Sequence, residues 1–248
     1  MKKGFTLAEV LITLGIIGVV AALTMPSLIA KHQEKERIVR LKKAYSIFSN
    51  AVNLAKIEHG DPNTWFIEGQ PDAPGAQVVY TILKPYLKTI KDCGNKTGCW
   101  AASLKELDGN PYSYGSINTS TSQWKLLLVD GMSIGFTVSG DINECVDRYS
   151  LTGYECAVIH IDVNGKAPPN TFGKDIFRLI IHTDQVIPSG LFTNNAMNNG
   201  QFHNRCTGTG TPVPPIGIHC AAWVIAHDNM DYLRCAGDLS WGGQTSCR

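Results

Sequence analysis

The sequence predicts an α+β fold. A long N-terminal helix, membrane-spanning in its first half, packs on an antiparallel β-sheet, and a disulfide-rich C-terminal region follows. Three observations carry this prediction. Residues 5–30 are almost wholly apolar, the strand signals come after residue 120, and all eight cysteines lie beyond residue 90. A chain of 248 residues is long enough for an anchor and one well-packed domain.

The chain divides by composition into six segments. In order they are a leader peptide (1–4), a transmembrane and assembly helix (5–30), an amphipathic helix continuing into the soluble domain (31–60), an αβ-loop region (61–123), the antiparallel sheet (124–187) and the Cys-rich C-terminal region (188–248).

The apolar segment 5–30 is long enough to span a bilayer, because about twenty apolar residues in a helix cross the hydrocarbon core. A secretory signal peptide has a shorter apolar core that ends in a small-residue cleavage site. Here the apolar run is longer and continues into a helical pattern. We therefore expect this segment to be kept as an anchor.

Glu9 interrupts the apolar segment. A carboxylate inside a membrane helix is costly and is by default a functional residue with a charged partner. The alternative places Glu9 among the lipid headgroups, which its closeness to the N-terminus allows. Position alone favours neither.

The run GFTLAEVLITLGIIGVVAALTMP, from Gly4 to Pro26, closely resembles the N-terminus of type IV prepilins and type II secretion pseudopilins. The resemblance implies the pilin fold, cleavage by prepilin peptidase after Gly4 and N-methylation of Phe5. It also implies that Glu9 pairs with the N-terminal amine of a neighbouring subunit during assembly. Two opposite charges that are each costly to bury become tolerable as a pair.

Gly15, Gly18 and Pro26 fall where the family has helix-weakening residues. Glycine is a poor helix former and proline removes a backbone donor, so the segment between them can stretch or kink. The glycines also suit close packing between membrane helices. Both roles are compatible in a filament core.

Basic residues lie on both sides of the span: Lys2 and Lys3 precede it, and six lysines and arginines follow between residues 31 and 43. The positive-inside rule alone would place the C-terminal domain in the cytoplasm. The cysteines and the resemblance place it outside, and we follow them. We expect a single-pass precursor in the inner membrane, with its soluble domain outside the cytoplasm, and later a periplasmic or extracellular filament.

The second half of the helix carries one apolar stripe, at alternating steps of three and four: Ile38, Leu41, Tyr45, Phe48, Val52 and Ala55. We expect the helix to end near Gly60-Asp61-Pro62. A short helix is expected around 78–87, and strands at 124–129, 132–138, 156–163 and 177–182. Asp130-Gly131 joins the first two strands as a hairpin. Three or four antiparallel strands need one apolar cover, which the stripe supplies.

The cysteines contain no C-x-x-C pair: Cys93, Cys99, Cys145, Cys156, Cys206, Cys220, Cys235 and Cys247. Zinc sites usually bring ligands in close pairs, so disulfides in an oxidising compartment are favoured over metal-bound or reduced thiols. On the order of a hundred pairings are open. Spacing favours neighbour pairs, 93–99, 145–156, 206–220 and 235–247. By resemblance to pilins, the last pair encloses an exposed C-terminal loop.

Calcium is the candidate cofactor, because the chain resembles pseudopilins and some major pseudopilins bind calcium in a C-terminal loop. Asp162, Asn164 and Asp175 supply oxygen ligands of the kind calcium takes. The alternative is a type I′ turn at Asn-Gly with Asp162 in an Asx-turn, which needs no ion. The residues favour this alternative.

The balance of 22 Lys and Arg against 21 Asp and Glu argues against nucleic-acid binding. The sequence contains no G-x-S-x-G, Walker or C-x-x-C motif, and we expect no enzymatic activity. We expect a structural subunit of a type IV pilus-like filament, a homo-oligomer handled by prepilin peptidase and by a pilus or type II secretion assembly platform. The alternatives are a type II secretion pseudopilin, a minor or tip subunit, and a membrane-anchored secreted binding domain. The leader and Glu9 argue against the last, since a simple anchor needs neither.

Overall fold

The computed structural model describes residues 6–65, 75–138, 145–147, 154–192 and 194–248. They fall into two compact units, 1–36 and 37–248, which are described separately below. Helix α1 (Leu7–His59) runs through both units. It ends at His59, and the predicted end near Gly60 is confirmed.

The first unit consists of the apolar part of α1. Within the described residues, α1 is the helix that is long and apolar enough to cross a membrane, judged by length and composition. Its most apolar stretch has a mean hydropathy of 2.3, and none of that stretch is buried. The helix continues through Pro26.

The second unit is built on an antiparallel sheet. Its seven described strands are β1 (Thr89–Gly94), β2 (Trp124–Leu128), β3 (Ser133–Thr137), β4 (Val146–Asp147), β5 (Tyr154–Asp162), β6 (Ile176–His182) and β7 (Val186–Pro188). The sheet order is β1-β2-β3-β5-β6-β7, and β4 pairs with β5. The predicted α+β architecture is confirmed, and so are the hairpin β2–β3 and the strands β5 and β6.

The expectation of three or four strands was too low. The sequence analysis missed β1, which lies in the segment 61–123 that we expected to be loop and short helix. Its residues TIKDCG are mostly polar, and its pairing with β2 is interrupted by register shifts. An edge strand of this kind lacks the alternating apolar pattern that predicts a strand. β4 and β7 span only two and three residues, which is too short for such a pattern.

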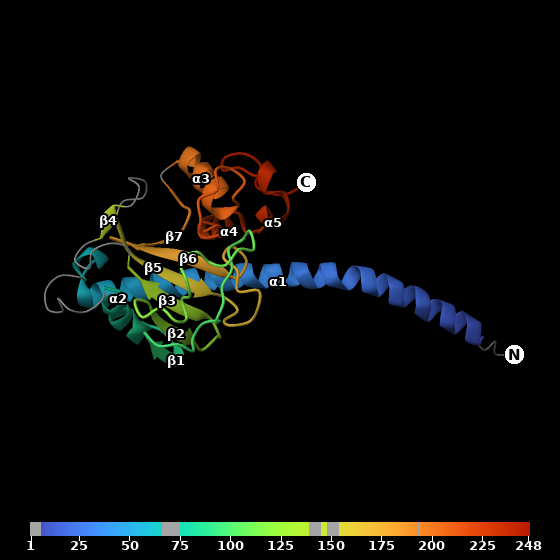
Figure 1. The fold of residues 1–248 in the computed structure, drawn as a ribbon, viewed down its shortest axis with the longest axis horizontal. Coiled ribbons are helices and arrows are strands. Elements are labelled where there is room, and N and C mark those ends of the chain that lie inside the picture. The colour runs from blue at the N-terminus through green and yellow to red at the C-terminus, as the bar shows by residue number, and fades with distance from the viewer. Residues whose placement is uncertain (1–5, 66–74, 139–144, 148–153, 193) are drawn as a thin grey trace. The chain divides into compact units, whose positions relative to one another are not determined.

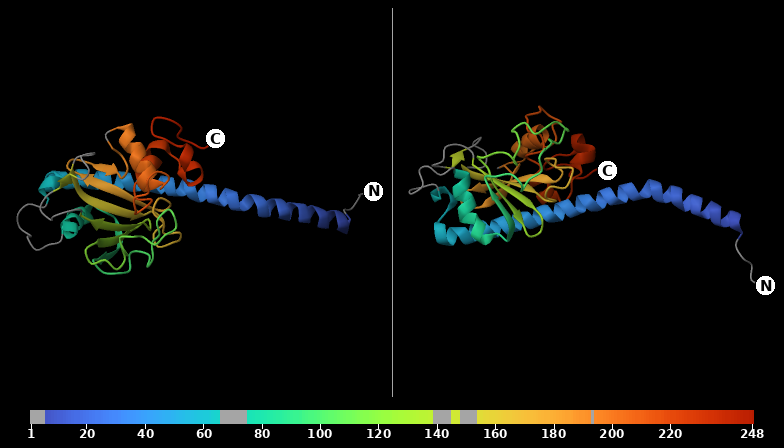
Figure 2. Two further views of the ribbon diagram at one scale, coloured as in Figure 1. Left: turned by 45° about the horizontal axis from the view of Figure 1, so that its top comes forward. Right: turned by 60° about the horizontal axis from the view of Figure 1, so that its bottom comes forward.

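One face of the sheet is covered by the second half of α1 and by α2 (Gly75–Leu83), which Figure 2 shows beside the strands. The α1 residues in this core are Ile38, Leu41, Ala44, Phe48, Ala51, Val52 and Ala55. The ring of Phe48 lies edge-on to Phe136 of β3, with centroids 6.1 Å apart. The predicted stripe is therefore the docking face, with Tyr45 half-buried at its margin.

Basic side chains of α1 bind the turns at the end of the sheet. Arg40 donates to the carbonyl of Val163 at 3.1 Å, and Lys43 pairs with Asp130 of the β2–β3 turn at 2.8 Å. These contacts fix the position of the helix along the strands, while the apolar stripe supplies the burial.

The opposite face of the sheet is covered by loops. Lys125 of β2 is fully buried there, and its ammonium donates to the carbonyls of Asn95, Asn118 and Ser120 at 3.1, 3.1 and 2.6 Å. Desolvation lowers the pKa of this amine. Gly135 of β3 lets the loops approach, because a Cβ there would lie 3.2 Å from Ile117 and 3.4 Å from Trp100. The loops are thus held close to the strands.

The remaining elements are short. They are the 3₁₀ helices η1 (Pro62–Thr64), η2 (Lys84–Tyr86) and η4 (Ala236–Asp238), the π-helix η3 (Phe202–Cys206), and the helices α3 (Asn195–Gln201), α4 (Ala221–His227) and α5 (Tyr232–Cys235). In the C-terminal region the ring of Trp223 is fully buried and stacks on Phe202 at 4.2 Å. This pair forms the centre of the C-terminal region.

If the α1 stripe covers the sheet as described, Phe48→Ala should lower the free energy of unfolding by about 3–5 kcal/mol, because it leaves a cavity beside Phe136. Ile57→Ala is the matched control, since Ile57 is on the same helix but 81% exposed, and should have little effect. Denaturant unfolding of the full-length protein in detergent, followed by tryptophan fluorescence, measures both. An equal decrease in the free energy of unfolding in the two variants would contradict the docking of this face of α1 on the sheet.

Candidate processing and assembly site

The predicted cleavage and methylation positions, Gly4 and Phe5, lie outside the described residues. The structure begins at Thr6, which precedes the first turn of α1. Thr6 and Glu9 form a reciprocal pair. The Thr6 amide and hydroxyl both donate to Oε2 of Glu9 at 2.8 Å, and the Glu9 amide donates to the Thr6 hydroxyl at 3.3 Å. This is a capping box, in which two helix-terminal donors are satisfied by each other's side chains.

The capping box gives Glu9 a local role that the sequence analysis missed. The signal was present as Thr6-Leu7-Ala8-Glu9, the T-x-x-E spacing of a capping box. The carboxylate also sits in the first turn of α1, where the helix dipole favours a negative charge. Cleavage after Gly4 would leave Thr6 as the second residue, so the mature chain would retain the box.

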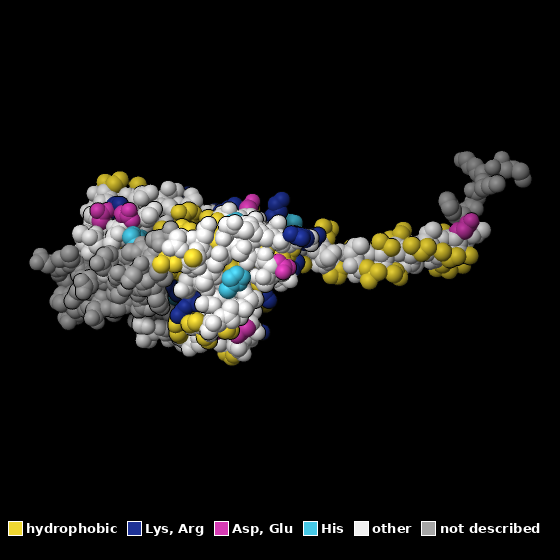
Figure 3. Space-filling view, turned by 90° about the horizontal axis from the view of Figure 1, so that it is seen from above, with side chains coloured by type: hydrophobic (Ala, Val, Ile, Leu, Met, Phe, Trp, Pro, Cys, Tyr) yellow, Lys and Arg dark blue, Asp and Glu magenta, His cyan; other side chains and the backbone are white. Residues whose placement is uncertain are grey.

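The apolar part of α1 has no polar face. Thirteen large apolar side chains of the first unit are exposed. Figure 3 shows the apolar surface on one side of this helix. They are Leu7, Val10, Leu11, Ile12, Leu14, Ile16, Ile17, Val19, Val20, Leu23, Met25, Leu28 and Ile29. A helix that is apolar all round belongs in a membrane or in a protein core. Gly15 and Gly18 lie in this stretch, and a Cβ at either position would meet no atom within 4 Å.

The eight cysteines form four disulfides, Cys93–Cys99, Cys145–Cys156, Cys206–Cys220 and Cys235–Cys247. These are the neighbour pairs that the spacing favoured. The first closes a loop at the end of β1, and the second holds the segment before β4 to β5. The other two link η3 to the start of α4 and α5 to the C-terminus.

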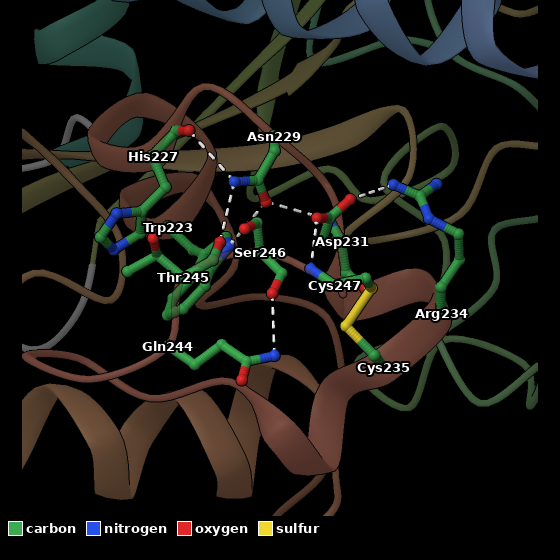
Figure 4. Close-up of polar contacts among 10 residues, drawn as sticks. All are labelled: Trp223, His227, Asn229, Asp231, Arg234, Cys235, Gln244, Thr245, Ser246 and Cys247. Carbon is green, nitrogen blue, oxygen red and sulfur yellow. Dashed lines mark hydrogen bonds and ion pairs between the residues drawn. A yellow bond between two sulfur atoms is a disulfide. The ribbon is translucent and has the colours of Figure 1, made fainter.

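The loop closed by Cys235–Cys247 is also held by side-chain hydrogen bonds (Figure 4). The Cys247 amide donates to the Asp231 carboxylate at 2.7 Å, and Arg234 pairs with the same carboxylate. Asn229 donates to the carbonyl of Thr245 at 3.0 Å and accepts from the buried indole of Trp223 at 3.2 Å. The C-terminal residues are therefore fixed to the core of this region by more than the disulfide.

Asp162, Asn164 and Asp175, the candidate calcium ligands, lie together at the end of β5. The two carboxylates are fully buried. Asp162 accepts from the Asn164 amide at 3.2 Å, and Asp175 accepts from the amides of Asn170 and Thr171 at 2.8 and 2.6 Å. With its carboxamide nitrogen turned inward, Asn170 also donates to Asp162 at 3.2 Å. Both carboxylates thus act as acceptors in hydrogen-bonded turns.

The turn at residues 162–165 is not the expected type I′ turn, because Asn164 has no positive φ. The Gly165 amide donates to the Asp162 carbonyl at 3.2 Å, and Asp at the first position with Gly at the fourth favours type I. A side chain at position 165 would clash with the Gly131 carbonyl, 2.4 Å away. The oxygen donors suit calcium chemically. The carboxylate oxygens already accept hydrogen bonds from amide groups, however, and calcium binding stays a prediction.

Two family models match the chain. The prokaryotic N-terminal methylation motif matches residues 1–25, and a family of unknown function (DUF6613) matches residues 27–111. No curated protein and no solved structure matches the chain. The methylation motif is the prepilin-peptidase signal of type IV pilins and pseudopilins. The motif therefore supports a type IV pilin-like or pseudopilin substrate, and the family that carries this motif is structural rather than enzymatic.

The buried Asp162 predicts a specific pH dependence. Burial and the neighbouring Asp175 carboxylate raise the pKa of Asp162 to about 9. The pKa of an aspartate in the unfolded chain is about 3.9. The folded state therefore keeps a proton that the unfolded state releases. The resulting stabilisation is complete below about pH 4 and is lost as the pH rises towards 9.

Asp162→Asn removes this titration and keeps an acceptor in the turn. Between about pH 5 and 9 the unfolding free energy of this variant should fall less than that of the wild type. Denaturant unfolding at a series of pH values, with calcium chloride or with a chelator, measures this. A calcium-dependent stabilisation that Asp162→Asn abolishes would instead show that the carboxylate is an ionised metal ligand.

Proposed function

We propose that the chain is a structural subunit of a type IV pilus-like filament, cleaved by prepilin peptidase, methylated at Phe5 and assembled through its N-terminal helix. One observation carries the proposal. The methylation motif at 1–25 includes the start of helix α1, whose apolar side chains are exposed on all sides in this part. Neighbouring copies of the same helix would cover that surface in a filament, as lipid covers it before assembly.

The precursor is proposed to cross the inner membrane once, with the domain 37–248 outside the cytoplasm. The four disulfides support this orientation, because disulfides form and persist in oxidising compartments. The six basic residues that follow the span argue for the opposite orientation by the positive-inside rule. Several of them have other roles, since Arg40, Lys42 and Lys43 bind or pair with the folded domain.

Glu9 is proposed to combine two roles at the start of α1. Thr6 uses one carboxylate oxygen for the cap, and a carboxylate offers about four acceptor sites in all. An isolated charge within the bilayer costs at least about 2–3 kcal/mol. The methylated amine of Phe5 on a staggered neighbour would supply the missing cation. That pair would also set the axial register between subunits.

Cleavage and methylation can be tested directly. Mass spectrometry of the mature protein should show a chain that begins with N-methylated Phe5. Co-expression with an inactive prepilin peptidase is the control and should leave the chain beginning at the unprocessed leader. A mature chain that begins beyond Ala22, as after signal peptidase, would contradict the proposal.

The two roles of Glu9 can be separated by substitution. Glu9→Gln keeps the capping geometry, because glutamine serves at this position of a capping box, but removes the charge. Thr6→Ala weakens the cap and keeps the charge. At matched membrane levels, Glu9→Gln and Glu9→Leu should both greatly reduce filament yield, while Thr6→Ala should have a smaller effect.

Filaments sheared from the cell surface, and those retained in the periplasm, are quantified separately by immunoblotting, which also distinguishes a pilus from a short pseudopilus. Glu9→Asp should give an intermediate yield, since the charge is kept and its reach is shortened. Wild-type yield from Glu9→Gln would show that Glu9 acts only as a cap.

A further inference from the structure

The sheet face opposite α1 carries a cavity of about 230 Å³. Along β5, Ile159 and Ile161 pack in the core with α1, so His160 between them points to the other face. Beside it lies Arg178 of β6, its cross-strand partner, and both side chains line this cavity. We call it the polar cavity.

Two segments distant in sequence complete the lining of the polar cavity. The loop before β2 contributes Tyr112, Tyr114 and Gln123, η3 contributes Arg205, and the segment between η3 and α4 contributes His219. Glu155, at the start of β5, lies on the same side, because a register shift between Glu155 and Ala157 changes the alternation there. All of these residues belong to the unit 37–248, so the cavity does not depend on the assembly helix.

The lining holds buried polar atoms for which the described part of the chain provides no hydrogen-bond partner. They are Oε1 of Gln123, Oε1 of Glu155, Nδ1 of His160, Nε of Arg178 and Nδ1 of His219. Glu155, His160 and His219 are more than nine-tenths buried, at 7%, 4% and 8% exposure. Buried polar groups in folded proteins are nearly always paired. A polar ligand bound in this cavity would supply hydrogen-bond partners for these five atoms.

The two arginines of the polar cavity suit an anion. Arg178 and Arg205 line it, and among the described lining residues Glu155 is the carboxylate, 4.0 Å from Arg178. Burial and the nearby arginines hold the pKa of His160 and of His219 well below the usual value, so both imidazoles are neutral. A neutral imidazole carries one donor and one acceptor, which suits a hydroxyl group. The described lining therefore offers guanidinium donors for an anion and several groups that bind hydroxyls.

Two tyrosines add aromatic surface. Tyr112 is buried, and its ring stacks on Phe172 with the ring centroids 4.3 Å apart. The ring of Tyr114 lies against that of Tyr112, with centroids 5.8 Å apart. Tyr114 is 65% exposed, which places it at the rim of the lining. Ligand pockets for drug-sized molecules enclose about 300–1,000 Å³, so this smaller cavity suits a single ring. An exposed aromatic ring at the rim can pack against the apolar face of such a ring.

We propose that the polar cavity binds a monosaccharide acid, with its carboxylate on Arg178 and Arg205 and its hydroxyls on Glu155, His160 and His219. An arginine fork matches the geometry of a carboxylate. The proposal goes beyond the filament function and does not depend on it.

The full-length protein in a zwitterionic detergent that carries no sugar can be titrated with D-glucuronate by calorimetry. D-Glucose presents the hydroxyls without the carboxylate, and acetate presents the carboxylate without the hydroxyls. Glucuronate should bind saturably, and each of the other two should bind roughly tenfold more weakly or worse. No saturable glucuronate binding, or acetate binding of equal strength, would overturn the proposal.

Arg205→Gln should weaken glucuronate binding by roughly tenfold or more, because it removes a charged hydrogen-bond donor. Tyr114→Ala should weaken it several-fold and keep the fold, since Tyr114 is largely exposed. Arg248→Gln is the matched control, because it removes one charge from an exposed position at the C-terminus, and should bind as the wild type. The unfolding midpoint of each variant verifies its fold. Wild-type affinity in both Arg205→Gln and Tyr114→Ala would overturn the proposal.

Discussion

The structure depends on how the surface of one helix is covered. The first part of α1 is apolar on every side and is exposed along its length. Such a surface is stable only in lipid or against other apolar surfaces. From Ile38 onward the same helix carries a single apolar stripe, and the sheet covers it. The change in the pattern of apolar residues therefore separates the part that needs an external environment from the part that belongs to a folded domain.

The domain 37–248 uses the two faces of its sheet differently. The face on α1 is an apolar core in which Phe48 and Tyr80 each meet Phe136 in a T-shaped, edge-to-face arrangement. The other face carries polar side chains, including the fully buried Lys125, and is covered by loops that disulfides and backbone carbonyls hold in place. The polar cavity lies on this second face.

Local patterns predicted much of this organisation. The N-terminal signal, the end of α1, the β2–β3 hairpin and the docking stripe each depend on residues close in sequence. The capping box of Thr6 and Glu9 could have been predicted on the same basis from its spacing. The short strands β4 and β7 and the polar edge strand β1 carry too little apolar pattern to be recognised. The polar cavity brings together strand and loop positions from Tyr112 to His219 that lie far apart in the sequence, so no local pattern predicts it.

The central claim is that Glu9 and the processed N-terminus join neighbouring subunits through the apolar helix. An electron cryo-microscopy reconstruction of the isolated filament tests it most directly. The account predicts a Glu9 carboxylate within about 4 Å of the Phe5 amine of a neighbouring subunit, with the apolar side chains of residues 7–29 buried between helices. A filament in which Glu9 faces solvent and the Phe5 amine lies elsewhere would contradict it.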